Sequence, residues 1–179
     1  RMWRFDLTGL AATVTLMGNA GALQPITTRP DVTECVWDEL DSKGDVVGAK
    51  RKTMVVYGTG RMLNLDDIPV ADVQSLYVLG DTTSTVALRG PAMVKQTLAK
   101  ADGKYTIAGA DVDLNKDAGW YVDFDKNDRE RVTIDPKIVS GTVVAVTNVP
   151  EPSTACKVGG TANIYQLGVC KGKSPRQDG

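Results

Sequence analysis

The chain has 179 residues, of which 21 are basic and 22 are acidic, so its formal net charge is −1 and it lacks the basic excess that nucleic-acid binding needs. It contains no histidine, which excludes Ser–His and Cys–His catalytic pairs and histidine-ligated zinc, iron or copper sites. Valine and threonine make up about a fifth of the sequence, and both favour strands. We expect one mostly β domain, or part of a larger all-β domain, without a membrane span.

Alternation of apolar and polar residues predicts strands in the first half of the chain. Residues 24–30 are bounded by prolines and are predicted to be an edge strand. The polar segment 31–52 is predicted to be a protruding hairpin or loop with a turn at residues 42–45. Residues 70–74 are predicted to form one helical turn. The predicted strands of this half cover residues 3–7, 12–16, 53–57 and 75–79.

The second half of the chain shows further short strands separated by Gly, Asp, Asn and Pro turns. Residues 92–101 are ambiguous, because Pro91 and Gly103 are helix start and stop signals while apolar residues alternate between them as in a strand. The whole pattern is typical of a sandwich, barrel or propeller. The predicted strands of this half cover residues 104–108, 119–124, 131–134, 141–149 and 162–167.

The sequence Gly58–Thr59–Gly60 follows a predicted buried strand and so invites comparison with a phosphate-binding loop. A dinucleotide fingerprint needs a third glycine or alanine three residues later and then a helix. Position 63 is leucine, and the loop-forming residues 66–69 follow it. We therefore interpret this sequence as a tight exit from the strand.

Four side chains on alternate residues form the opening pattern of a calcium-binding loop. However, Lys116 replaces the glycine that the turn of such a loop needs, and Val122 replaces the closing glutamate. The two interpretations are a metal site and a solvated acidic turn. Lys116 and Val122 favour the solvated turn. The candidate ligands of this acidic ladder are Asp111, Asp113, Asn115 and Asp117.

Two other groups of carboxylates have simpler interpretations. The acidic residues between 123 and 130 are interrupted by Lys126 and Arg129, which predicts a charged hairpin tip. Asp66 and Asp67 are adjacent, but no nucleophile or general acid accompanies them in the sequence, so we expect them to cap a turn.

The three cysteines bear on the compartment of the protein. Cys156 and Cys170 flank the predicted strand around Ile164, and a hairpin could bring their Cα atoms to the separation of about 5.5 Å that a disulfide needs. If the protein is exported, we take Cys156–Cys170 as the disulfide candidate. Cys35 is then free or paired outside this chain.

Several strings of residues occur in order from residue 2 to about residue 167. The most distinctive is Tyr57–Gly58–Thr59–Gly60–Arg61. The others lie at residues 2–7, 24–30, 62–63, 72–77, 119–123, 130–132, 156 and 159–161. Together they resemble the C-terminal β-propeller of the PilC/PilY-type adhesins, which occur at the tips of bacterial type IV pili. Residues 31–52 are longer than the family leads us to expect, and Cys170 has no family role that we can assign.

The resemblance implies that residues 1–179 are the C-terminal part of a PilY-type propeller, built from short antiparallel four-stranded blades with little helix. It implies three to four blades, if each takes roughly 40–50 residues. Residues 31–52 would be a protruding insertion and residues 171–179 a flexible tail. The resemblance also favours a strand over a helix for residues 92–101.

The resemblance further implies a non-enzymatic component of the type IV pilus system that acts in pilus assembly, tip adhesion and twitching motility. Such a protein is exported to the pilus tip, outer membrane or cell surface. Its partners would be minor pilins or other tip subunits, a host or surface receptor, and the remaining blades of the parent chain. Calcium would bind in the parent protein, upstream of Arg1.

Two other functions stay open on the sequence. An independent secreted or surface β-sandwich that binds carbohydrate or protein would bury its strands within this chain. A glycosidase that uses Asp or Glu pairs needs no histidine; its candidate carboxylates would be Asp66, Asp67, Asp111 and Asp113.

Overall fold

A computed structural model describes residues 1–101, 104–151 and 159–175. The regular secondary structure of this part is almost all β-strand, which confirms the all-β class, and a short 3-10 turn, η1 (Leu65–Asp67), lies between the fourth and fifth strands. The strands are β1 (Met2–Asp6), β2 (Thr13–Gly18), β3 (Asp31–Leu40), β4 (Val46–Gly58), β5 (Ser75–Gly80), β6 (Met93–Ala101), β7 (Lys104–Gly109), β8 (Gly119–Asp123), β9 (Arg131–Val132), β10 (Lys137–Val139), β11 (Thr142–Pro150) and β12 (Gly160–Gly168).

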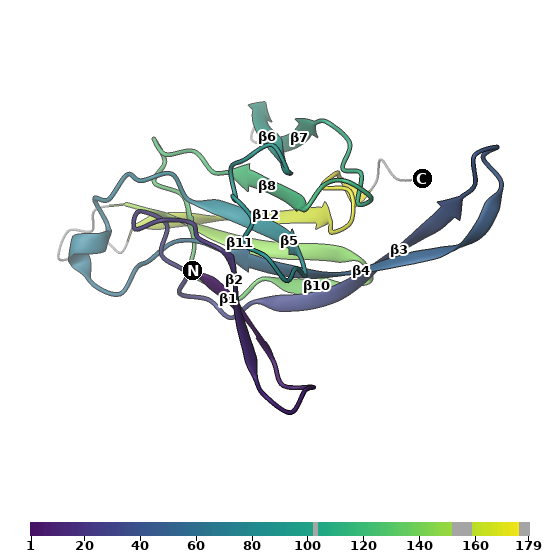
Figure 1. The fold of residues 1–179 in the computed structure, drawn as a ribbon. Coiled ribbons are helices and arrows are strands. Elements are labelled where there is room, and N and C mark those ends of the chain that lie inside the picture. Colours follow the sequence, from purple (N-terminus) through teal and green to yellow (C-terminus); the bar gives the residue numbers. More distant parts are fainter. Residues whose placement is uncertain (102–103, 152–158, 176–179) are drawn as a thin grey trace.

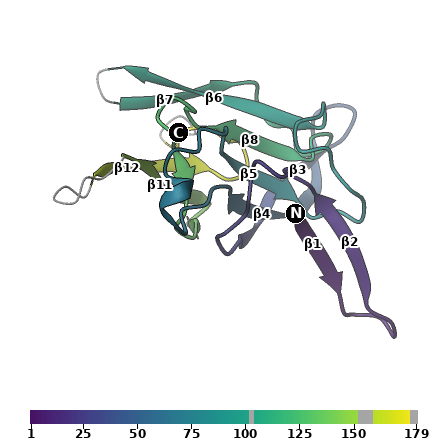
Figure 2. The ribbon, with the colours of Figure 1, turned by 90° about the vertical axis from the view of Figure 1, so that its left-hand side faces the viewer.

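The described strands form three sheets (Figures 1 and 2). The largest has six strands in the order β3-β4-β5-β8-β6-β7, antiparallel except for the parallel pair β6–β8. A second sheet has the order β10-β11-β12, with β9 also paired to β11. The third is the two-stranded hairpin β1–β2, which projects from the body of the molecule. The six-stranded sheet with its parallel pair differs from the short antiparallel four-stranded blades that the resemblance implies.

Both faces of the central strands are buried, as their near-continuous apolar sequences predict. One face of β4, β5 and β8 packs with residues of β11 and β12, and the indole of Trp120 donates a hydrogen bond of 2.6 Å to the carbonyl of Val169. The other face carries three stacked tyrosines, Tyr57, Tyr77 and Tyr121. These tyrosines pack with Met17 at the end of β2, so the projecting hairpin is attached at its base.

Several segments differ from the prediction. Residues 24–30 form no strand; the carbonyl of Pro25 instead accepts a hydrogen bond from Gly60, in a loop. The helical turn predicted at 70–74 is absent, and the 3-10 turn η1 occurs just before it. Residues 92–101 do contain a strand, as we favoured. Most of residues 31–52 pair as the two strands of the long β3–β4 hairpin.

The predicted disulfide between Cys156 and Cys170 is wrong. Cys170 is bonded to Cys35 on β3, with the two Cα atoms 5.7 Å apart, and a sulfur atom forms only one such bond. The nine residues of β12 lie between the two cysteines of the prediction, and an extended strand of that length spans about 30 Å. Cys156 itself lies outside the described residues. The observed bridge joins the edge of the large sheet to the segment that follows β12.

No helix among the described residues is long and apolar enough to cross a membrane.

Candidate docking site

The site begins where β4 ends, at the distinctive string Tyr57–Arg61. A Cβ atom on Gly58 would overlap the side chain of Val132, and one on Gly60 would lie 2.6 Å from the Cβ of Arg131. Gly60 also has a φ of +145°, which L-residues with side chains rarely adopt. The two glycines therefore let the exit from β4 lie directly against β9, and the loop that follows, residues 59–74, is called the anchored loop below.

A buried arginine holds the first half of the anchored loop. Arg131, only 3% exposed, donates hydrogen bonds of 2.9 Å, 2.6 Å and 2.6 Å to the carbonyls of Arg61, Asp67 and Val70. Each carbonyl accepts its hydrogen bond from a charged guanidinium, and such bonds are stronger than those between neutral groups. One side chain from β9 thus fixes the backbone of the loop at three points.

The carboxylate of Asp67 completes this first anchor. It accepts hydrogen bonds from the backbone amides of Leu63 (2.8 Å) and Asn64 (3.3 Å) and from the guanidinium of Arg61 (2.6 Å). The bond from Leu63, followed by that from Arg61, outweighs burial and lowers the pKa of Asp67 below its usual value. Asp67 and Asn64 also form a capping box on η1, in which each side chain accepts a hydrogen bond from the backbone amide of the other residue. The expectation that Asp67 caps a turn is therefore confirmed.

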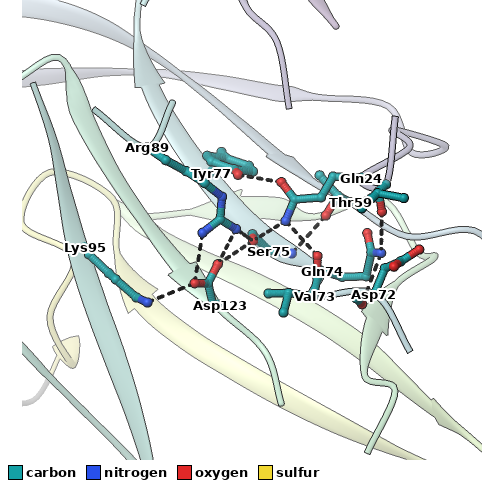
Figure 3. A network of polar contacts seen from close by, with 11 residues as sticks. Gln24, Thr59, Asp72, Val73, Gln74, Ser75, Tyr77, Arg89, Lys95 and Asp123 are labelled. Atoms are coloured by element: carbon teal, nitrogen blue, oxygen red, sulfur yellow. Dashed lines mark hydrogen bonds and ion pairs between the residues drawn. The ribbon is translucent and has the colours of Figure 1, made fainter. Parts of the chain in front are cut away.

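A second polar network holds the other end of the loop (Figure 3). The hydroxyl of Thr59 accepts a 2.8 Å hydrogen bond from the backbone amide of Ser75, which closes the loop between β4 and β5. Gln24 donates 2.8 Å hydrogen bonds to the carbonyl of Val73 and to the Ser75 hydroxyl, and its own carbonyl accepts one of 2.7 Å from Tyr77. The segment before β3 is thereby tied to the end of the loop.

Asp123, on β8, is the charged centre of the second network (Figure 3). It pairs with Arg89 at 2.6 Å and with Lys95 at 3.0 Å, and it accepts a 2.7 Å hydrogen bond from Ser75. Burial alone would raise the pKa of Asp123, but the bonds from Arg89, Ser75 and Lys95 outweigh it and lower the pKa. Arg89 also lies over the ring of Tyr121, 5.0 Å from its centroid. The contacts with Arg89, Lys95 and Ser75 keep the Asp123 carboxylate ionised, and the contact with Ser75 ties it to the end of the loop.

Within the first anchor, between Arg61 and Asp67, the loop presents apolar side chains to solvent. Met62, Leu63 and Leu65 are 43%, 78% and 76% exposed. They face the ends of β11 and β12 across a groove of about 610 Å³, called the apolar groove below. It is lined mainly by Met62, Leu63, Leu65, Ile68, Val149, Pro150 and Ala162. A fixed loop with exposed leucines beside a groove is suited to binding another surface.

Both hairpins carry further exposed apolar residues. On β1–β2, Phe5 and Val14 are cross-strand neighbours and are 65% and 54% exposed. On β3–β4, Val36, Leu40 and Val46 are all more than half exposed. Side chains of this kind on projecting strands indicate contact surfaces.

The acidic ladder is not arranged around a common point. The Asp117 carboxylate accepts a hydrogen bond from the amide of Asp113, and Asp113 accepts two from Asn115 and pairs with Lys116 at 3.3 Å. Asp111 is 96% exposed and pairs with Lys173. In the described part of the chain, no three acidic or sulfur side chains lie where they could hold a metal ion.

Several residues of the anchors were not singled out as site residues from the sequence. Arg131 and Gln24 lie within strings that carry the family resemblance, at residues 130–132 and 24–30, and that was the available signal. Arg89 and Asp123 are 34 positions apart and lie in no common motif. Only the fold brings them together.

The fold and this surface together define an all-β module whose anchored loop exposes apolar side chains beside a groove. No protein-family model matches the chain, and no solved structure matches it either. The chain is similar to a protein of Xylella fastidiosa (strain Temecula1 / ATCC 700964), the type IV pilus biogenesis factor PilY1 homolog, with 23% identity over 177 residues. The match covers 93% of this chain and 14% of the relative's length.

Proposed function

We propose that this chain is a non-enzymatic β-module of a type IV pilus-related protein, which is exported to the cell surface and contributes to pilus assembly, tip adhesion and twitching motility. The similarity over 93% of the chain to a type IV pilus biogenesis factor carries this proposal. The chain spans only 14% of that relative, so the functions of a whole protein of that kind are part of the proposal.

The anchored loop supplies the binding surface in this proposal. Two partly buried polar networks fix its backbone, so little backbone entropy is lost when Leu63 and Leu65 meet a partner. We propose a minor pilin or another pilus-tip subunit as that partner, with an apolar surface that fills the groove. A host or surface receptor is the second kind of partner, and the hairpins offer separate surfaces for it.

We propose further that the chain is part of a larger β-propeller, which the exposed edges of its sheets support. The strands β3 and β7 are edges of the large sheet within the described residues, and β1–β2 has no third strand there. Exposed edges of this kind are covered by further strands in a closed propeller. The remaining blades of a parent chain would cover them here.

The proposal is tested in the bacterium that encodes the chain, with the full-length protein. We expect the protein in the sheared pilus fraction, and we expect Leu63→Asp combined with Leu65→Asp to reduce its amount there about tenfold or more, because two charges would enter an apolar interface. Leu10→Asp is the matched control, since Leu10 is fully exposed at the tip of β1–β2 and away from the groove. Absence of the wild-type protein from surface and pilus fractions would overturn the proposal.

An independent binding sandwich is the second candidate, because a single apolar core joins the large sheet to β9, β11 and β12 within this chain. A sandwich of this kind would be a stable monomer on its own. A sharp two-state thermal transition of the purified monomer, together with unchanged pilus assembly in a deletion strain, would favour it over the pilus module.

A further inference from the structure

A pocket that borders the second anchor at Asp123 contains a buried carboxylate with an unused oxygen. The pocket, of about 260 Å³, lies between the β6–β7 hairpin and the turn that joins β8 to β9. Glu130, at the end of this turn, lines it and is only 1% exposed. Oε1 of Glu130 accepts hydrogen bonds from Thr147, from Asn163 at 2.9 Å and from Tyr165 at 2.7 Å.

The second oxygen of Glu130 is the unusual atom. Oε2 is buried and accepts no hydrogen bond from the described part of the chain. No described cation lies within ion-pair distance of Glu130 either. A buried carboxylate oxygen left in this state is costly, and a positively charged donor would remove the cost.

The other lining groups favour a cation with an apolar stem. Leu98, Tyr105 and Phe124 form apolar and aromatic walls. Asp125 adds an exposed carboxylate, and Asp123, which is already paired with Arg89 and Lys95, adds another. Lys100 is the one basic residue among the lining residues, and its ammonium lies over the Tyr105 ring, 5.2 Å from the centroid. The native side chain thus shows that the rim of the pocket already receives an ammonium group.

We propose that this pocket binds a primary ammonium group, namely the lysine side chain of a partner protein, with Oε2 of Glu130 as the buried acceptor. The tetramethylene stem of a lysine would lie against the apolar walls. Its ammonium would reach Oε2 once the side chains that cover this oxygen have shifted, because the exposed area of the atom is below 1 Å². A metal ion fits less well, because no three acidic or sulfur side chains of the described residues are placed to hold one. The proposal is independent of the pilus role.

The test is a titration of the isotope-labelled chain, followed by NMR, with Nα-acetyl-lysine methylamide as the probe. Nα-acetyl-norleucine methylamide is the matched control, since it has a similar stem and no charge. We expect saturable shifts of the backbone amides of Tyr105, Asp125 and Glu130 with the lysine probe and none with the norleucine probe. Equal shifts with both probes, or no shifts with either, would overturn the proposal.

Three variants locate the acceptor. Glu130→Gln should weaken binding of the lysine probe about tenfold or more, because it removes a buried charge. Lys100→Met should strengthen binding about twofold, since it removes a competing ammonium at the rim, and Asp125→Asn should weaken it about twofold. If Glu130→Gln fails to fold, the opposite signs of the two rim variants still decide, and an unchanged affinity in both would count against the site.

Discussion

The anchored loop and the β1–β2 hairpin both present apolar side chains to solvent, but they are held in different ways. The loop is fixed along its length by Arg131 and Asp67 at one end and by the Asp123 network at the other. Within the described residues the hairpin is attached near its base, by the burial of Met17, by a 2.8 Å hydrogen bond from the amide of Val86 to the carbonyl of Met17, and by the 3.1 Å ion pair between Arg4 and Asp81. Two-stranded sheets are marginally stable on their own.

Exposed apolar area therefore does not distinguish the anchored loop from the hairpin, because both have it; the contacts that hold the backbone do. Polar contacts hold the backbone of the loop on both sides of its leucines, whereas the outer part of the hairpin is held by the pairing of its own two strands. Measurements of stability separate the two regions.

Replacement of the buried clamp should have the largest effect. Arg131→Met leaves the carbonyls of Arg61, Asp67 and Val70 without their donor, and we expect a loss of about 3–5 kcal/mol in the free energy of unfolding. Urea denaturation measures it. Arg29→Met, at an arginine that is 70% exposed, is the control and should change stability by less than about 0.5 kcal/mol.

The glycine at the exit of β4 should come next. Gly60→Ala forces a Cβ atom against Arg131 and the backbone of Val132 at a positive φ, and we expect a loss of about 2–3 kcal/mol. Gly21→Ala is the matched control, because Gly21 also has a positive φ but has open space around it. Equal losses in both variants would mean that backbone conformation, and not the contact with β9, decides the effect.

Asp123 should make stability depend on pH. Its pKa in the folded chain lies below the value near 3.9 of an unfolded chain, so its contribution is complete above about pH 5 and is lost as the pH falls through the folded pKa. Asp123→Asn should cost about 1–2 kcal/mol at pH 7 and should flatten the acid limb of the stability profile. A variant with the same acid limb as the wild type would show that the Arg89 and Lys95 pairs contribute nothing.

The hairpin should give the smallest effect. Phe5→Ser changes a side chain that is 65% exposed, and we expect global stability to fall by less than about 0.5 kcal/mol. Met17→Ala, at the buried base, is the contrasting variant and should cost about 2–4 kcal/mol. A large loss from Phe5→Ser would contradict the view that the hairpin is held only at its base.

The sequence predicts the strands far better than the anchors. Segments in which apolar residues alternate or run together, such as 53–57 and 75–79, form buried strands, because their apolar side chains must be shielded from water on at least one face of the sheet. Residues 24–30 mislead, since the prolines suit a strand edge while Pro25 and Gln24 in fact bond to the anchored loop. Such contacts join residues about fifty positions apart, as in the Gln24–Ser75 pair separated by 51, and no local pattern encodes them.

The disulfide shows the same limit. Proximity in sequence favoured Cys156 with Cys170, but the observed bridge has a sequence separation of 135. The buried position of Cys35 on β3 depends on how the two larger sheets pack, and spacing alone does not reveal it.

We propose that the anchored loop contacts a pilus component. Site-specific photo-crosslinking tests it most directly, with a photoreactive residue placed at Leu63 or at Leu10 of the full-length protein in the bacterium that encodes it. We expect the Leu63 position to crosslink to a type IV pilus subunit, identified by mass spectrometry, and the Leu10 position not to crosslink to that subunit. Efficient crosslinking from Leu10 alone, or crosslinks from Leu63 only to proteins outside the pilus system, would contradict the account.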